Sequence, residues 1–165
     1  MQIYSVNDAR QGLDFLTLDI GMDSPGSLEV PTYRIPLDSG AKVALARRIA
    51  GALLNCGSAL LWITGWGIWP SSEHLDLFDR YRLSFGETRS LGEAPIHLLE
   101  KSEEEILVSL ISIGLFFIWD MELFDLERKL VVRVSHDGWI ESKMSSGEEE
   151  LCVSLRDDLM LEPWT

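Results

Sequence analysis

The chain has 165 residues, of which 46% are hydrophobic and 25% charged, and this composition excludes a largely disordered chain because it supplies enough apolar surface for a core. Its 27 acidic and 14 basic side chains give a net charge of -13, which argues against nucleic acid and anionic membranes as partners. The length predicts one domain that buries about 70% of the surface of its unfolded chain.

The N-terminal part of the chain predicts short strands. Residues 2–6 and 13–20 are rich in β-branched and aromatic side chains and are bounded by turn-forming residues, so each predicts a strand. Residues 28–36 contain Pro31 and Pro36, which donate no backbone hydrogen bond. This segment therefore predicts an edge strand or an extended connector.

The long stretch from Ile49 to Ser72 contains no charged side chain. About 20 consecutive apolar residues suffice to cross a bilayer, but glycines, a proline and polar side chains interrupt this stretch. We therefore interpret this stretch as part of the buried core of a water-soluble protein and not as a membrane span. The pattern predicts a helix that begins at Asp38 or Ser39 and runs to about Asn55, a turn, and a buried strand over 59–69.

A helix and a short strand are predicted next. Ser71 or Ser72 caps a helix that runs to about Leu83, and residues 96–100 predict a short strand. The inward side of this helix is predicted to carry Leu75, Phe78, Tyr81 or Arg82, and Phe85.

An apolar helix and a meander follow. Ser102 and Glu105 have the spacing of a capping box, which predicts the start of a helix that ends at Gly114. A tight turn is predicted at 136–138, because Asp-Gly tolerates the positive φ that such turns require. The strands of this antiparallel meander are predicted over 115–124, 129–135 and 139–144.

The last predicted element is a helix over 147–160, with a strand over 150–155 as the alternative. Together the elements predict an α+β fold. We expect a mainly antiparallel sheet of five to seven strands that carries three or four helices packed mostly on one face.

The turn after the predicted buried strand, residues 65–74, is the first candidate site. Ligands of α/β sheets collect at the carboxyl ends of strands, near the free N–H groups of helix N-termini. The glycines of this turn permit close backbone approach, and its candidate side chains are Trp66, Trp69 and His74. The alternative is that the glycines only make room for the packing of the two tryptophans.

Asp120 is the second candidate, because it interrupts an apolar run and is predicted to lie inside the sheet or at its rim. A carboxylate in such a place has a shifted pKa or needs a partner, for which we expect Arg133 on the next strand. The alternative is strand alternation, which places Asp120 with Glu122 and Phe124 on a half-exposed face. For an enzyme, Asp120 and His74 are the catalytic candidates.

No motif in the chain specifies a cofactor or a metal, and we expect neither. The candidate turn lacks the third glycine of a dinucleotide fingerprint, and the three histidines lack paired ligand spacing. A metal site that assembles through space from the histidines with Asp120 or Asp137 is the alternative to surface or satisfied core histidines. Cys56 and Cys152 lie in apolar contexts that suit buried thiols, and no secretory signal is visible, so we expect a cytoplasmic protein.

The size and charge are those of immunity and inhibitor proteins that neutralise basic toxins, an analogy of composition and not of motif. We therefore expect a non-enzymatic module that binds a basic protein partner through acidic and aromatic surface residues. The alternatives are a small-molecule binder or hydrolase at the turn 65–74 with Asp120, and a structural homodimer that pairs through an apolar patch. The expected binding residues are Trp66, Trp69, Trp139, Glu148, Glu149, Asp157 and Asp158.

Overall fold

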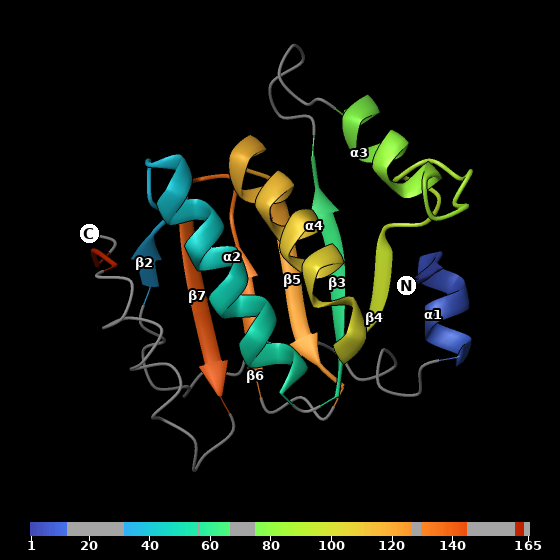
Figure 1. Cartoon of the computed structure of the whole chain (residues 1–165), viewed down its shortest axis with the longest axis horizontal. Coiled ribbons are helices and arrows are strands. Elements are labelled where there is room, and N and C mark those ends of the chain that lie inside the picture. The colour runs from blue at the N-terminus through green and yellow to red at the C-terminus, as the bar shows by residue number, and fades with distance from the viewer. Residues whose placement is uncertain (13–31, 56, 67–74, 127–129, 145–160, 164–165) are drawn as a thin grey trace.

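The computed structural model of the chain describes residues 1–12, 32–55, 57–66, 75–126, 130–144 and 161–163. In this part of the chain, seven strands form one antiparallel sheet in the order β1-β4-β3-β5-β6-β7-β2 (Figure 1). The strands are β1 Gln2–Tyr4, β2 Thr32–Arg34, β3 Ser58–Gly65, β4 Ile96–Glu100, β5 Asp120–Asp125, β6 Leu130–Val134 and β7 Trp139–Met144. The helices are α1 Val6–Gly12, α2 Ser39–Leu54, α3 Leu75–Leu83, the 3-10 helix η2 Lys101–Glu103, and α4 Glu104–Phe117.

Helices α2 and α4 lie side by side on one face of the sheet, and α3 lies on the same face beside them (Figure 1). Leu61 of β3 faces these helices, whereas its neighbour Leu60 faces away and packs with Ala9 of α1. Both leucines are fully buried, so the middle of β3 is covered on both faces, as predicted. The predicted α+β architecture is confirmed. Among the described helices, none has the length and apolar character needed to span a membrane.

Helix α2 forms where its sequence predicts it. The carboxylate of Asp38 accepts a hydrogen bond from the backbone N–H of Ala41 at 2.8 Å and so caps the first turn. Leu45, Ile49 and Leu53, at helical spacing, are buried against the sheet. The predicted boundaries of this helix are confirmed.

The predicted capping box of α4 is wrong, although the helix begins at Glu104, two residues after the predicted cap. Ser102 and Glu105 do not form the capping box; Glu100 and Glu103 do, and they open the short helix η2 that precedes α4. The backbone N–H of Glu100 donates to the carboxylate of Glu103 at 3.0 Å. Strand β4 therefore leads directly into the helix, and its last residue supplies the cap.

The predicted end of α4 is also wrong, because Gly114 lies inside the helix. A Cβ added to Gly114 would lie 2.2 Å from the Sδ of Met121, so the glycine makes room for a side chain of the sheet. The helix continues to Phe117 and ends at Ile118, which adopts the left-handed conformation with φ 55°. Residues 115–119 are thus not part of a strand, and β5 begins only at Asp120.

The remaining predictions divide into three groups. The short strand β4, the edge position of β2 and the turn at 136–138 are confirmed, the last by the φ of 87° at Gly138. Phe85 was predicted to point inward and is exposed, because α3 ends at Leu83 before reaching it. The strand over 13–20 and the helix over 147–160 lie outside the described residues.

Candidate functional site

Three of the residues that the sequence singles out, Trp66, Asp120 and Trp139, lie at the upper end of the sheet in the view of Figure 1, where β3 ends and β5 and β7 begin. Asp120, the first residue of β5, lies opposite Gly65 at the end of β3. The turn between β6 and β7 brings His136 onto Asp120. We call the following set the upper edge: Gly65, Trp66, Asp120, His136, Asp137 and Trp139.

Asp120 and His136 form the centre of the upper edge. The carboxylate accepts a hydrogen bond from the backbone N–H of His136 at 2.8 Å, and the ring Nδ1 lies 2.9 Å from both of its oxygens. Because an ionised carboxylate only accepts hydrogen bonds, we assign the ring proton to Nδ1, which leaves Nε2 as an acceptor. The hydrogen bond to Asp120 raises the pKa of His136 above its ordinary value, and the nearby charges of Asp120 and Asp137 act in the same direction.

The predicted partner of Asp120 is wrong. Arg133 instead lies between Glu122 and Glu141, with a nitrogen 3.3 Å from an oxygen of each carboxylate. The strand register explains the difference, because it places Arg133 directly opposite Glu122 on one side and Glu141 on the other. Asp120 lies beyond this row of pairs and, like Glu122, is half-exposed, as the alternative prediction had it. The same prediction is wrong for Phe124, which is buried with Ala9 of α1.

Gly65 is needed for the position of Asp120. A Cβ at Gly65 would lie 2.5 Å from the Oδ2 of Asp120, which is closer than real Cβ contacts. The pairing of β3 with β5 is also irregular between Ile63 and Gly65. The close approach expected at this glycine therefore occurs, and the group that approaches is a carboxylate of the protein itself.

Trp66 and Trp139 lie at the same edge and are both partly exposed. Trp66 packs against the main core and lies close to Gly92, whereas Trp139 begins β7 opposite Arg34 of β2. The structure therefore brings Asp120, Trp66 and Trp139 to one edge of the sheet. The other predicted site residues lie outside the described residues: Trp69, His74, Glu148, Glu149, Asp157 and Asp158.

A second group of polar side chains is enclosed beneath α3. His97 of β4 is fully buried, and neither of its ring nitrogens has a hydrogen-bond partner among the described residues. Burial lowers the pKa of His97 to about 3, and the positive charge of Arg82 acts in the same direction. The ring of Phe78 lies between His97 and Trp119, with centroid distances of 5.7 and 5.1 Å. His97 is therefore a core residue, but in the part of the chain that the structure describes its ring nitrogens lack the hydrogen bonds that we expected of a core histidine.

Arg82 is the charged member of this enclosed group. One nitrogen of its buried guanidinium donates to the carbonyl oxygen of Ala94 at 2.7 Å, and another lies 3.4 Å from a carboxylate oxygen of Asp79. Burial lowers the pKa of Arg82. The bond to Ala94 ties α3 to the segment that leads into β4, and Phe78 packs against His97 of β4, so we assign the group to stability and not to the candidate site.

The contact that sequence reasoning missed is the hydrogen-bonded pair of His136 with Asp120, because we placed His136 in the turn and joined it to Asp120 only in the alternative of a metal site. The signal that could have found it is the hairpin register: pairing Glu122 with Arg133 brings the residues after β6 next to Asp120. Within the described part of the chain, no group of three or more His, Cys, Asp or Glu side chains is arranged to hold a metal ion. Comparisons with protein-family models, curated proteins and solved structures found no match.

Proposed function

We propose that this chain is a non-enzymatic, intracellular protein-binding module that engages a basic protein partner. The observation that supports the proposal is the composition of the upper edge, where Asp120 and Asp137 lie with Trp66 and Trp139. Partly exposed tryptophans are favoured as anchors of protein interfaces, and carboxylates beside them attract Lys and Arg side chains. The net charge of -13 extends this attraction to the approach of the partner.

Affinity capture at two salt concentrations tests this proposal. Immobilised protein is incubated with native lysate at about 0.05 M and about 0.5 M salt, a range over which charge interactions are strongly screened. We expect a basic protein to be retained at low salt and released at high salt. The double variant Asp120→Asn with Asp137→Asn should retain less of it, whereas the control Glu104→Gln, at the opposite end of the fold, should behave as the wild type. Retention that does not respond to salt or to these variants would contradict the proposal.

The second candidate function is a small-molecule binder or hydrolase, and the Asp120–His136 pair is the observation that favours it. A histidine whose Nδ1 is held by a carboxylate presents Nε2 as a general base. Hydrolysis of p-nitrophenyl acetate provides the test. A rate that falls in both His136→Asn and Asp120→Asn would favour the enzyme, whereas a rate equal to that of free imidazole would count against it.

A further inference from the structure

Ile118, which ends α4, is in a conformation that suits it poorly. Its φ of 55° and ψ of 56° are left-handed, a region in which helices usually place glycine or asparagine and in which β-branched residues are rare. Its side chain is 37% exposed, so burial offsets only part of this strain. A residue that costs the fold stability and leaves an apolar side chain in water points to a contact outside the described fold.

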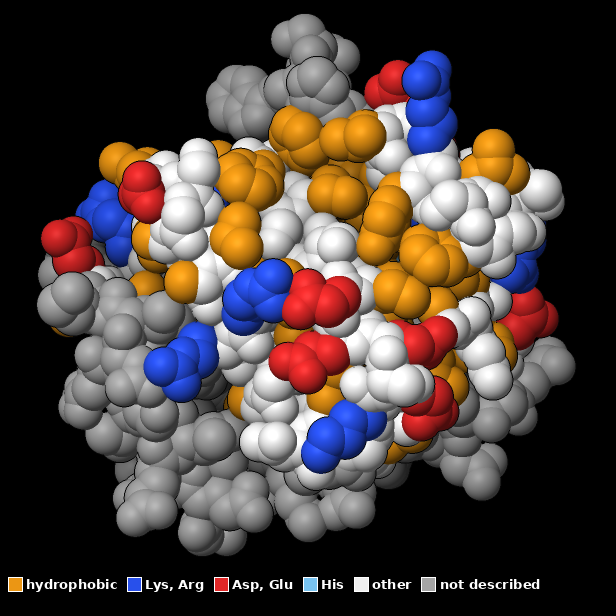
Figure 2. All heavy atoms as spheres, viewed as in Figure 1, with side chains coloured by type: hydrophobic (Ala, Val, Ile, Leu, Met, Phe, Trp, Pro, Cys, Tyr) orange, Lys and Arg blue, Asp and Glu red, His pale blue; other side chains and the backbone are white. Residues whose placement is uncertain are grey.

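The outer face of α4 also indicates a contact outside the described fold. No residue from Ile106 to Trp119 is charged. The hydroxyl groups of Ser109 and Ser112 do not reach outward, because they donate to carbonyl oxygens one turn back at 2.8 and 2.7 Å. Figure 2 shows hydrophobic side chains over the C-terminal half of α4 and toward α3, and charged ones over the N-terminal half of α4. A helix that is apolar all round is normally buried, so this end of α4 is suited to being covered.

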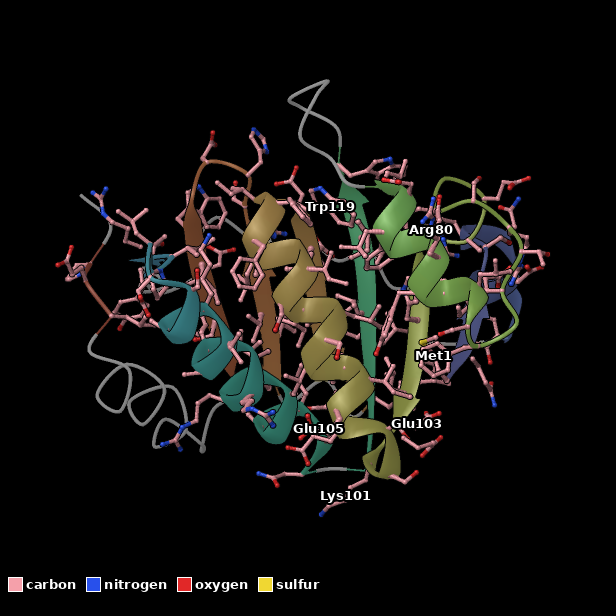
Figure 3. All side chains as sticks on the ribbon, turned by 45° about the horizontal axis from the view of Figure 1, so that its top comes forward. Met1, Arg80, Lys101, Glu103, Glu105 and Trp119 are labelled. Atoms are coloured by element: carbon pink, nitrogen blue, oxygen red, sulfur yellow. The ribbon has the colours of Figure 1, made fainter. Side chains whose placement is uncertain are left out.

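Other exposed apolar side chains lie at the same end of the molecule. The ammonium of Lys42 donates to the carbonyl oxygen of Leu115 at 3.0 Å, which places the start of α2 beside the end of α4. Trp119 lies between the end of α4 and α3 (Figure 3), in ring contact with Phe78. We call the exposed members of this region the apolar cap: Leu37 (93% exposed), Leu77 (50%), Phe116 (40%) and Ile118 (37%).

Charge decides which partner suits the apolar cap. Carboxylates neighbour its members along the chain, because Asp38 follows Leu37, Asp76 precedes Leu77, and Asp120 lies two residues after Ile118. The carboxylate of Asp38 also caps α2 and that of Asp120 also accepts from His136. The ammonium of Lys42 is directed inward onto the end of α4 and over the ring of Phe116. A second copy would bring the same carboxylates and the same net charge of -13, which would oppose pairing.

We infer that the apolar cap anchors the apolar side chain of a basic protein segment, while the bordering carboxylates face its Lys and Arg side chains. This inference rests on the proposed function and assigns the contact surface. The cap adjoins the upper edge at Trp119 and Asp120, so one partner spans both. Ile118 and Phe116 are the residues that make the apolar contact.

Synthetic amphipathic peptides test the inference. The probe is a helical peptide of leucine and lysine, and its counterpart of leucine and glutamate is the charge control. We expect the wild type to bind the first and not the second. The variant Ile118→Asn should bind about tenfold more weakly, the loss expected when one interface anchor is removed, with a melting temperature no lower than that of the wild type because asparagine tolerates the left-handed conformation. The control Leu83→Ser changes an exposed leucine at the far end of α3 and should bind as the wild type.

Three outcomes would overturn the inference. The first is Ile118→Asn binding the lysine peptide as tightly as the wild type. The second is that amide NMR shifts caused by the peptide map outside residues 113–120 and 75–78. The third is a wild-type dimer in analytical ultracentrifugation that Ile118→Asn dissociates, because the occupant would then be a second copy. If lysate capture still responds to salt and to the Asp120 and Asp137 variants, the proposed function stands without this anchor.

Discussion

His97 should make the protein sensitive to acid in a pH range where few other groups titrate. In the folded chain burial holds the pKa of His97 at about 3, whereas in the unfolded chain it returns to its ordinary value of 6.5. At a pH between these two values, the His97 ring binds a proton in the unfolded chain but not in the folded chain. The contribution of His97 to the free energy of unfolding is therefore fully present above pH 6.5 and is lost progressively as the pH falls toward 3.

The size of the effect follows from the two pKa values. Lowering the pH from about 7.5 to about 5 should reduce the free energy of unfolding by about 2 kcal/mol through His97 alone, an order-of-magnitude figure. This is a large part of the roughly 5–15 kcal/mol that stabilises a typical domain. The variant His97→Leu lacks the titrating ring, so it should not lose this contribution. Two unpaired ring nitrogens also disappear in the variant, so it should be at least as stable as the wild type at neutral pH.

Urea unfolding followed by tryptophan fluorescence measures this difference at each pH. The stability of His97→Leu relative to the wild type should rise by about 2 kcal/mol between about pH 7.5 and pH 5. His136 acts with the opposite sign, because its pKa is raised and its stabilisation is present at low pH, but it contributes equally to both proteins. The hydrogen bond with Arg89 lowers the pKa of Glu87 to about 2, so this carboxyl titrates mainly below pH 5. A relative stability that is independent of pH would refute the reasoning.

Two glycine substitutions test the packing described above. Gly114→Ala should destabilise the protein by about 1–3 kcal/mol, because the new Cβ would overlap the buried side chain of Met121; thermal unfolding measures the loss. Gly65→Ala should displace the Asp120 carboxylate and return the pKa of His136 toward its ordinary value, which an NMR titration of the ring protons follows.

The substitution of Gly114 has a matched control, and that of Gly65 has an outcome that would contradict it. Gly51→Ala also changes a glycine inside a helix, but its nearest neighbouring atom lies 3.7 Å from the new Cβ, so this variant should gain up to about 1 kcal/mol. Equal effects of the two helix substitutions would show that helix propensity, and not contact with the sheet, decides the cost at Gly114. An unchanged titration of His136 in Gly65→Ala would show that the position of the Asp120 carboxylate does not require a glycine at position 65.

The elements that the sequence predicts well are those in which local and tertiary preferences agree. Asp38 caps α2 through its own backbone neighbours, so no distant contact is needed to predict the start of that helix. Strand β6 alternates cleanly, with Leu130, Val132 and Val134 buried and Val131 and Arg133 between them partly exposed, because one face meets the helices.

The failures have tertiary causes. Gly114 has the sequence character of a helix stop, but it serves the packing of Met121, which arrives from a different element. The partner of Asp120 depends on the alignment of two strands, and the alternation within one strand does not specify that alignment. For this reason the sequence singles out Asp120 as a candidate but does not specify His136 as its partner.

The position of Arg133 between Glu122 and Glu141 has a consequence for assembly of the meander. A one-residue slip of β6 against either neighbour would turn the guanidinium toward the helix-covered core and send the valines beside it into the opposite face. The native alignment pairs the Arg133 guanidinium with both Glu122 and Glu141 and leaves Val132 and Val134 buried in the core. The two ion pairs of Arg133 therefore favour the same alignment of β5, β6 and β7 that the burial of the core side chains requires.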